Sequence, residues 1–381
     1  MWLPLSRPRR HPRDADRRGG EALSPARVDL DDAAAIAALD TGDMLGTVAA
    51  LGDHIEAGYA SGLATTGLPS LDGVTSVVFC GMGGSAVAGD VLRQTFRDRL
   101  PVPVDVNRTP FLPEYAGPHT LVIASSFSGE TSETLSSVEE AIRRGCRMLA
   151  ITSGGRLGAR CDEHGIARAS VPAGFQPRAA LGHLTFAMLG ALEAAGLVPS
   201  IEDDVQETLS SMRGLIAGMT PDVPMAENPA KELADWLDDR VAVVWGADGI
   251  GAVAAMRWKT QLNENGKVPA WHSAMSELDH NEVVGWVKPF GSMHAVIALR
   301  SDHEHREIAA RFPLSLDIAR DAGAEVREVT VPGRGPLATL LSLVTIGDFA
   351  SCYVGVRHGA DPTPVEVIQG LKAALAAMDL G

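Results

Sequence analysis

The feature that most constrains the fold is an alternation of short apolar segments with amphipathic helical patterns. Residues 75–80, TSVVFC, are apolar and β-branched and run into glycines, whereas residues 120–126, TLVIASS, run into a loop of serine and glycine. A helical pattern at 133–145 follows the second of these segments. Apolar strands that alternate with helices are typical of a parallel sheet covered on both faces. The alternation therefore predicts right-handed crossovers and an α/β fold.

The same plan begins again in the second half of the chain. Residues 241–249, VAVVWGADG, repeat the strand that ends in glycines, and a helical pattern follows at 251–264. A proline-rich stretch at 221–231 is the expected junction. We therefore predict two doubly wound parallel-sheet α/β domains in tandem, residues 73–222 and residues 223–381.

The region before the first domain is expected to differ from the rest. Apolar residues between 28 and 60 recur at spacings of three and four, so residues 27–72 are predicted to be a helical segment that packs on the core. Residues 1–26 carry arginine and proline without the apolar stretch that a secretory signal needs. We interpret residues 1–26 as a disordered tail.

The net charge of the chain limits the kinds of molecule that it can bind. The formal net charge is −15 at pH 7, which argues against a nucleic-acid surface. Any anionic substrate must then be held by local donors, because the overall field opposes it. The four cysteines are scattered, and no apolar run is expected to approach the roughly 20 residues of a membrane span. We therefore expect a reduced, cytoplasmic protein that binds neither membrane nor nucleic acid.

Two loops that follow predicted strands are rich in small polar residues. The first is GMGGS at 81–85, and the second is SSFSGET at 125–131. Glycines allow close approach of a ligand to the backbone, and hydroxyls beside free helix amides can hold an anion without a lysine. The candidate binding residues are Gly83, Gly84, Ser85, Ser126, Ser128 and Thr131. For a single hydroxyl, helix capping is the alternative interpretation.

Other patterns leave alternatives open. Gly81, Gly83 and Ala86 fit a dinucleotide pattern with Asp105 about 20 residues later, a weak indication of a nicotinamide-dependent dehydrogenase. Arg178, in QPRAALG, either faces solvent or stabilises charge in a cleft.

The segment 257–286 is dense in titratable residues, with Glu264 between two asparagines and His280 within DHNE. A metal site there would draw on several of these side chains, but none has the helical His spacing of a zinc signature. The possible ligands are His272, Glu277, Asp279, His280 and Glu282.

Six motifs occur together in a fixed order: GMGGSA, SFSGETSET, QPRAALG, NENGK, ELDHNE and DPTPVEVIQGLK. In this combination the chain resembles the bifunctional phosphoglucose/phosphomannose isomerases of the sugar isomerase (SIS) superfamily, from about residue 40 to the end. The interval of sixteen residues from Glu264 to His280 is also that of the family. The resemblance implies two SIS domains of the flavodoxin-like sandwich type. It also implies isomerisation of glucose 6-phosphate and mannose 6-phosphate to fructose 6-phosphate through an enediol, without cofactor or metal.

The resemblance also implies roles for individual residues. The two loops match the family's sugar-phosphate binders, and Glu264 matches the base that moves a proton between C1 and C2. Arg178 matches the cation near the enediolate. His280 matches the residue that assists ring opening from the other subunit of a homodimer, and Lys372 matches the lysine of the last helix near the ring oxygen. Glu130 departs from the family's asparagine and places an acid beside the expected phosphate.

Three other functions stay open at this point. Another SIS enzyme, acting on amino sugar or pentose phosphates, is one alternative, although the Glu–His pair together with QPRAALG argues against it. A non-catalytic sugar-phosphate-binding protein is another, although such regulators usually carry a DNA-binding segment, which this acidic chain lacks. The third is the dehydrogenase indicated by the glycine pattern.

Overall fold

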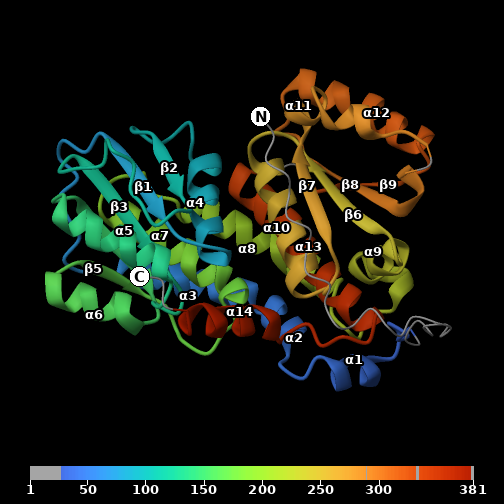
Figure 1. Ribbon diagram of the computed structural model, residues 1–381, viewed down its shortest axis with the longest axis horizontal. Helices are drawn as coiled ribbons and strands as arrows, with labels where there is room; N and C mark the ends of the chain where they lie inside the picture. Colours follow the sequence, from blue (N-terminus) through green and yellow to red (C-terminus); the bar gives the residue numbers. More distant parts are fainter. Residues whose placement is uncertain (1–26, 289, 332–333, 379–381) are drawn as a thin grey trace, which may run out of the picture.

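The computed structural model describes residues 27–288, 290–331 and 334–378. The interpretation of residues 1–26 as a tail falls outside this part of the chain. Within the described residues the strands form two parallel sheets, which Figure 1 shows in separate halves of the molecule. This arrangement confirms the prediction of two tandem α/β units.

Sheet A has the strand order β2-β1-β3-β4-β5 among the described residues. Its strands are β1 (Ser76–Cys80), β2 (Val104–Asn107), β3 (Thr120–Ser125), β4 (Arg147–Thr152) and β5 (Ala167–Ser170). The central strand β3 is buried along its whole length, because helices cover both faces. Val122 and Ala124 face α5 (Ser132–Arg143) and α6 (Gly155–His164), whereas Leu121 and Ile123 face the core that includes α4 (Gly84–Thr95) and α7 (Leu181–Ala194).

Sheet B has the order β7-β6-β8-β9 in the described part of the chain. Its strands are β6 (Val241–Gly246), β7 (Ala270–Ala274), β8 (His294–Arg300) and β9 (Glu325–Thr330). One face packs in the same core as α10 (Ile250–Glu264) and α13 (Pro336–Arg357), and the other packs against α11 (Met275–Leu278) and α12 (Arg306–Asp321). Both sheets are therefore doubly wound, and they place the carboxyl ends of their strands where loops can form a site.

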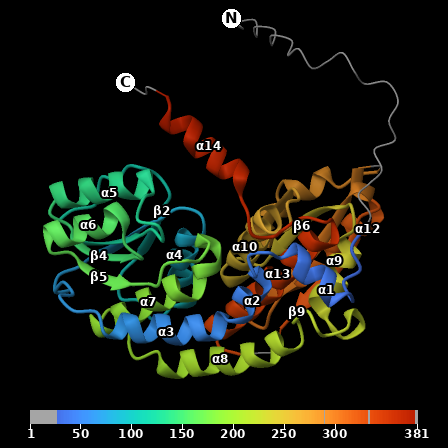
Figure 2. The ribbon, with the colours of Figure 1, turned by 90° about the horizontal axis from the view of Figure 1, so that it is seen from below.

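The remaining helices complete the core. They are α1 (Ala33–Leu39), α2 (Met44–Ala49), α3 (Leu51–Leu63), α8 (Glu202–Ala217), α9 (Pro229–Leu237) and α14 (Glu366–Ala376), with short 3-10 turns η1 (Pro177–Ala180), η2 (Met225–Glu227), η3 (Glu282–Gly285) and η4 (Phe290–Met293). Helices α3 and α8 run side by side along the lower edge of the molecule in Figure 2. One hydrophobic core runs through residues of both sheets, so the two halves are packed against each other and not merely tethered.

Helix α13 is the most deeply buried helix that joins the halves. It is 22 residues long and apolar enough to span a membrane by length and composition, but that apolar stretch is completely buried inside the protein. Its burial against α8, α9 and α10 identifies it as a core helix. Among the residues that the structure describes, α13 is the only helix with this length and composition.

Helix α14 is the exception to this packing. It projects from the body of the protein in Figure 2, and no other described helix or strand packs extensively against it. Its large apolar residues are exposed: Val367, Ile368, Leu371 and Leu375.

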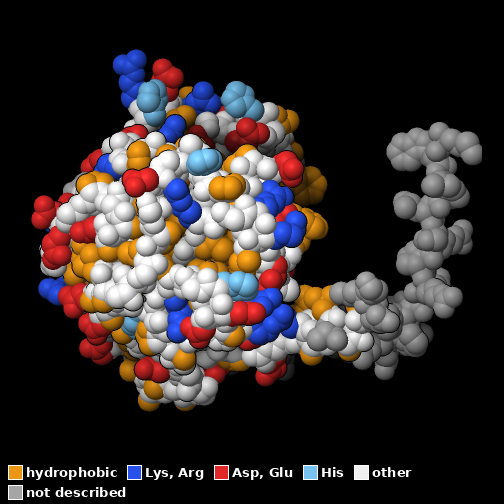
Figure 3. All heavy atoms as spheres, turned by 90° about the vertical axis from the view of Figure 1, so that its left-hand side faces the viewer, with side chains coloured by type: hydrophobic (Ala, Val, Ile, Leu, Met, Phe, Trp, Pro, Cys, Tyr) orange, Lys and Arg blue, Asp and Glu red, His pale blue; other side chains and the backbone are white. Residues whose placement is uncertain are grey.

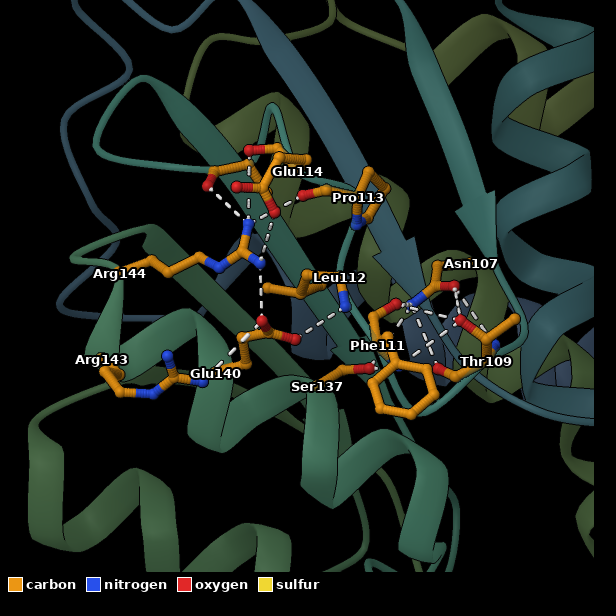
Figure 4. Close-up of polar contacts among 11 residues, drawn as sticks. Asn107, Thr109, Phe111, Leu112, Pro113, Glu114, Ser137, Glu140, Arg143 and Arg144 are labelled. Carbon is orange, nitrogen blue, oxygen red and sulfur yellow. Dashed lines mark hydrogen bonds and ion pairs between the residues drawn. The ribbon is translucent and has the colours of Figure 1, made fainter.

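The loop after β2 is held against α5 by a polar network (Figure 4). Arg144 donates to the carbonyl of Pro113 at 2.9 Å and to Glu140 Oε1 at 2.6 Å. Glu140 Oε2 accepts from the backbone N–H of Leu112 at 2.9 Å. This backbone hydrogen bond and Arg144 lower the pKa of Glu140. The network fixes the long loop that leads from the carboxyl end of β2 back to the start of β3.

The surface shown in Figure 3 has Lys and Arg side chains interspersed with Asp and Glu, without a continuous basic patch. On this face, the basic side chains form no continuous footprint of the kind that binds a phosphate backbone.

Candidate active site

The first loop, residues 81–85, connects β1 to α4 and lies against Arg178. Gly83 has φ +52°, a left-handed conformation that favours glycine. Gly84 approaches the backbone of η1 so closely that a Cβ would lie 3.0 Å from the Cα of Arg178. Ser85 is buried, and its Oγ accepts from the N–H of Phe127 at 3.3 Å. The first loop therefore contacts both the second loop and Arg178.

The second loop, residues 125–131, brings its own hydroxyls together at the start of α5. Ser126 Oγ and Thr131 Oγ1 are 2.9 Å apart, and Ser128 Oγ accepts from the N–H of Glu130 at 3.2 Å. Gly129 has φ +71°, and a Cβ there would lie 2.0 Å from the carbonyl oxygen of Gly154. Only glycine fits this position, which brings the loop close to the loop after β4.

Glu130, the acid that departs from the family pattern, does not point freely into this loop. Its Oε1 accepts from the N–H of Arg156 at 2.9 Å, in the first turn of α6. A carboxylate at a helix N-terminus is stabilised by free amides and by the helix dipole. The carboxylate of Glu130 is therefore stabilised at the start of α6, and this contact offsets the repulsion that its charge would exert on a phosphate in the second loop.

Arg178 lies in η1 and is 2% exposed. Its Nε donates to Asn265 Oδ1 at 2.6 Å, and its Nη2 donates to the carbonyls of Pro362 and Thr363, each at 2.8 Å. Its Nη1 lies 3.6 Å from Glu264 Oε2 and has no hydrogen-bond partner within the described residues. Burial lowers the pKa of the Arg178 guanidinium, and the charge of Glu264 opposes this shift. The solvent-facing alternative for Arg178 is therefore wrong.

Glu264 is the last residue of α10, and its side chain is 28% exposed. It lines a cavity of about 620 Å³. The cavity is lined by Asn263, Glu264, Lys267, Ala360, Asp361, Pro364, Val365, Glu366, Val367 and Ile368. The carboxylate therefore faces both a buried guanidinium and an accessible space.

Lys267 closes one side of this cavity. Its Nζ donates to the carbonyl of Glu264 and, at 3.0 and 2.6 Å, to those of Pro362 and Pro364. An ammonium has three donors, so all three are used. Burial and the neighbouring Arg178 lower the pKa of Lys267. We interpret Lys267 as a tie between the end of α10 and the segment that leads into α14.

Two predicted site residues, His280 and Lys372, have no hydrogen bond or ion pair with Glu264 within the described part of one chain. His280 follows α11, is exposed, and its ring makes no hydrogen bond or ion pair with Glu264 in the described structure. Lys372 is exposed on α14, one helical turn beyond Ile368, which lines the cavity.

Two of the acidic residues considered for a metal have other partners. Asp279 binds Arg311 and Ser315, and Glu282 accepts from Trp245 Nε1 at 2.9 Å. Across the residues that the structure describes, no three His, Cys, Asp or Glu side chains gather as metal ligands would.

Comparisons with known proteins agree with this geometry. The SIS domain family matches residues 71–193, and the bacterial phospho-glucose isomerase C-terminal SIS domain family matches residues 226–375. The bifunctional phosphoglucose/phosphomannose isomerase of Caldicellulosiruptor bescii is 36% identical over 87% of this chain and 99% of its own length. That of Aquifex aeolicus is 33% identical over 78% of this chain and 90% of its own. The chain belongs to the bifunctional phosphoglucose/phosphomannose isomerase family.

Solved structures show the same fold at low identity. A hypothetical protein, TT0462 of Thermus thermophilus, aligns with a TM-score of 0.68 at 17% identity, over 92% of this chain and 95% of its own. The C-terminal domain of glucosamine-fructose-6-phosphate aminotransferase from Francisella tularensis aligns with a TM-score of 0.66 at 15% identity, over 84% and 98%. Membership of the phosphoglucose/phosphomannose isomerase family makes this chain a sugar-phosphate isomerase.

Proposed function

We propose that Glu264 and Arg178 carry out the interconversion of glucose 6-phosphate and mannose 6-phosphate with fructose 6-phosphate. Glu264 takes the proton from C2 of the open-chain aldose, and the electrons of the C2–H bond form an enediolate with its negative charge on O1. The hydroxyl proton of O2 then passes to O1 as the C2 carbonyl forms, and Glu264 returns its proton to C1. The reverse transfer gives either aldose, depending on the face of C2 that receives the proton. This proton transfer needs no change in oxidation state of any group outside the sugar.

The observation that carries the proposal is the pairing of Glu264 with the free Nη1 of Arg178. A base must be within reach of the carbon that it deprotonates, and Glu264 borders an accessible cavity. The negative charge that develops on oxygen needs a fixed donor in a poorly hydrated place. Arg178 meets this requirement because it is 2% exposed and has one N–H pair without a hydrogen-bond partner in the described structure.

The first and second loops, residues 81–85 and 125–131, are proposed to hold the phosphate. The first loop lies directly against Arg178, which in turn contacts Glu264. An anion held by Ser85, Ser126, Ser128 and Thr131 would anchor the end of the sugar that does not react. Binding energy from the phosphate would then align C1 and C2 with the base. Gly83 and Gly84 allow the backbone to approach that anion.

Dual specificity is proposed to follow from rotation of the open chain. Glucose and mannose 6-phosphates differ only at C2, so rotation about C2–C3 would present either C2 proton to Glu264. Thr363 lies next to this region, since its carbonyl accepts from Arg178 Nη2. We propose that it helps to leave the necessary room.

Ring opening is proposed to use His280 from a second subunit, with Lys372 near the ring oxygen. Support comes from two exposed apolar surfaces on one chain. One is the stripe of α14, and the other lies around η3 and η4, where Trp271, Val284, Val287 and Phe290 are at least half exposed. Helix α14 has 11 residues, and helices this short are marginal in water without packing.

A twofold dimer would cover both surfaces, since each copy offers each surface to the other. We therefore propose a homodimer that shares its active sites. We also propose a cytoplasmic location, in which the free cysteines stay reduced. The domain limits at 73–222 and 223–381 are likewise proposed.

The substitution Glu264→Gln tests the base. It keeps the size of the side chain but removes the proton acceptor, so kcat for both aldoses should fall by roughly three orders of magnitude. Coupled assays that detect fructose 6-phosphate measure the rate, and calorimetry measures binding, which should persist. Glu56→Gln, on an exposed glutamate paired with Arg213, is the matched control with unchanged rates. Turnover of Glu264→Gln close to that of the wild type would remove Glu264 from this role.

A further inference from the structure

Two buried arginines lie next to each other in this site, but their surroundings differ in charge. Arg257 is 1% exposed and binds Asp348 through two hydrogen bonds, Nε to Oδ1 at 3.1 Å and Nη2 to Oδ2 at 2.8 Å. Its Nη2 also donates to the backbone carbonyl of Arg178 at 2.7 Å. Burial raises the pKa of Asp348, and the Arg257 ion pair opposes this shift. The nearest buried carboxylate is thus engaged by Arg257.

Arg178 is instead held by neutral acceptors. Its hydrogen bonds go to two backbone carbonyls and to the side-chain amide of Asn265. The carboxylate of Glu264, at 3.6 Å, is beyond hydrogen-bond distance. Neutral acceptors fix the direction of a guanidinium without cancelling its charge, whereas a bidentate carboxylate does both.

The orientation of the Asn265 amide is determined by its neighbours. Ser351 Oγ donates its only hydrogen to the carbonyl of Asp348 at 2.8 Å. It can therefore only accept from Asn265, whose Nδ2 lies 3.1 Å away. This places Asn265 Oδ1 toward Arg178 Nε. Asn265 is completely buried, so water does not compete for either bond.

We propose that Asn265 is a positioning residue that aims Arg178 at the reacting oxygens while leaving its positive charge available to them. The inference rests on the proposed role of Arg178. Three of the guanidinium's directions are occupied, and the remaining Nη1 faces Glu264. The enediolate formed beside Glu264 then meets an arginine that no other carboxylate has neutralised.

The substitution Asn265→Asp tests the proposal, because it changes the charge at position 265. Aspartate keeps an acceptor for Arg178 but adds a negative charge beside it. Enediolate stabilisation should weaken, so kcat should fall by about 100-fold while KM changes by less than about threefold. The acid limb of the kcat/KM pH profile should move up by about one pH unit, because a second negative charge nearby disfavours the ionised base.

Several other charged or titratable groups face Arg178 and Glu264, and these groups are the same in the wild type and in Asn265→Asp. They are Arg257, Lys267, Asp348, Cys352 and Asp361. The displacement of the acid limb between wild type and variant therefore reports the new charge. A purely structural role for Asn265 would lower the stability of the variants and leave the kcat of the folded enzymes unchanged.

Asn228→Asp is the matched control. Asn228 is also buried, and its Oδ1 caps α9 by accepting from Ala230 and Lys231. Aspartate caps helices as well as asparagine does, so this variant should keep the wild-type kcat and pH profile.

Asn265→Ala keeps the test decisive if the aspartate variant does not fold. It removes the acceptor without adding charge, so kcat should fall about tenfold at nearly unchanged KM. Either variant with the kcat of the wild type, or a folded Asn265→Asp enzyme with an unmoved acid limb, overturns the inference. These outcomes leave the proposed function intact as long as the wild type isomerises the sugar phosphates and Glu264→Gln does not.

Discussion

At the scale of single residues, the site depends on positions where only one residue type satisfies the geometry. Gly129 is the sharpest case, because its left-handed backbone and its approach to Gly154 both exclude a side chain. Glu130, beside it, departs from the family pattern but caps α6. The second loop can therefore tolerate an acid at 130 but no Cβ at 129.

Gly129→Ala should raise KM at least tenfold, because the second loop must move away from Gly154 to make room. Left-handed strain alone costs about 1–2 kcal/mol. Because the steric conflict adds to this strain, the free energy of unfolding should fall by more than that amount. Kinetics and urea unfolding measure the two effects. Gly145→Ala is the matched control, since Gly145 has φ +66° but open space around it. Equal effects of the two variants would contradict this account of the loop.

At the scale of elements, the contact between α3 and α7 depends on glycines and on two buried histidines. A Cβ at Gly62 would lie 2.4 Å from the carbonyl of Ala187, so the helices touch backbone to backbone. His54 and His183 stack there with ring centroids 4.6 Å apart, and the Nδ1 of each has no hydrogen-bond partner within the described residues. Burial lowers the pKa of both, that of His183 to about 4.

Acid should therefore weaken this contact. The unfolded chain binds a proton at His183 near pH 6.5, but the folded protein does so only near pH 4. Stability is complete above pH 6.5 and falls by up to about 3 kcal/mol as the pH decreases to 4. His183→Phe should flatten this part of the pH dependence, as measured by urea unfolding between pH 7.5 and pH 4.5. His119→Phe, at an exposed histidine, should retain the wild-type slope; the same slope in His183→Phe would refute the prediction.

At the scale of the whole molecule, each chain is proposed to contain only part of an active site. Glu264 and Arg178 meet within one chain, whereas His280 is exposed and unconnected to them in the described structure. The exposed stripe of α14 and the apolar surface around η3 give a second copy somewhere to bind. In a shared site, activity depends on residues from two chains, so defects in different chains can be separated.

Two inactive variants should therefore restore activity when their subunits exchange. In a mixed dimer of Glu264→Gln and His280→Ala, one of the two sites combines an intact Glu264 with an intact His280. Equal mixing should give about a quarter of the wild-type activity, since about half of the dimers are mixed. Glu264→Gln mixed with Arg178→Met is the control, and it should stay inactive because each site keeps one defect. No recovery in the first mixture, once exchange is verified by mass, would exclude a shared site.

The sequence alone determined the α/β architecture, because the buried strands β1, β3, β6 and β8 are apolar on both faces and need helices on each side. It did not indicate the short edge strands β5 and β7, since edge strands are partly exposed and ARAS and AWHSA are not continuously apolar. Local glycine and hydroxyl patterns were likewise enough to mark the two loops, because turns and helix N-termini are local structures.

Only the tertiary structure decided where Arg178 lies and what it contacts. Its local sequence suited a solvent-facing arginine as well as a buried one, and its partners Asn265, Pro362 and Thr363 are distant in the chain. Burial, a free N–H pair and neutral acceptors are properties of the packed molecule, and no spacing within one segment encodes them. The electrostatic character of the site therefore arises where three distant segments meet around one guanidinium.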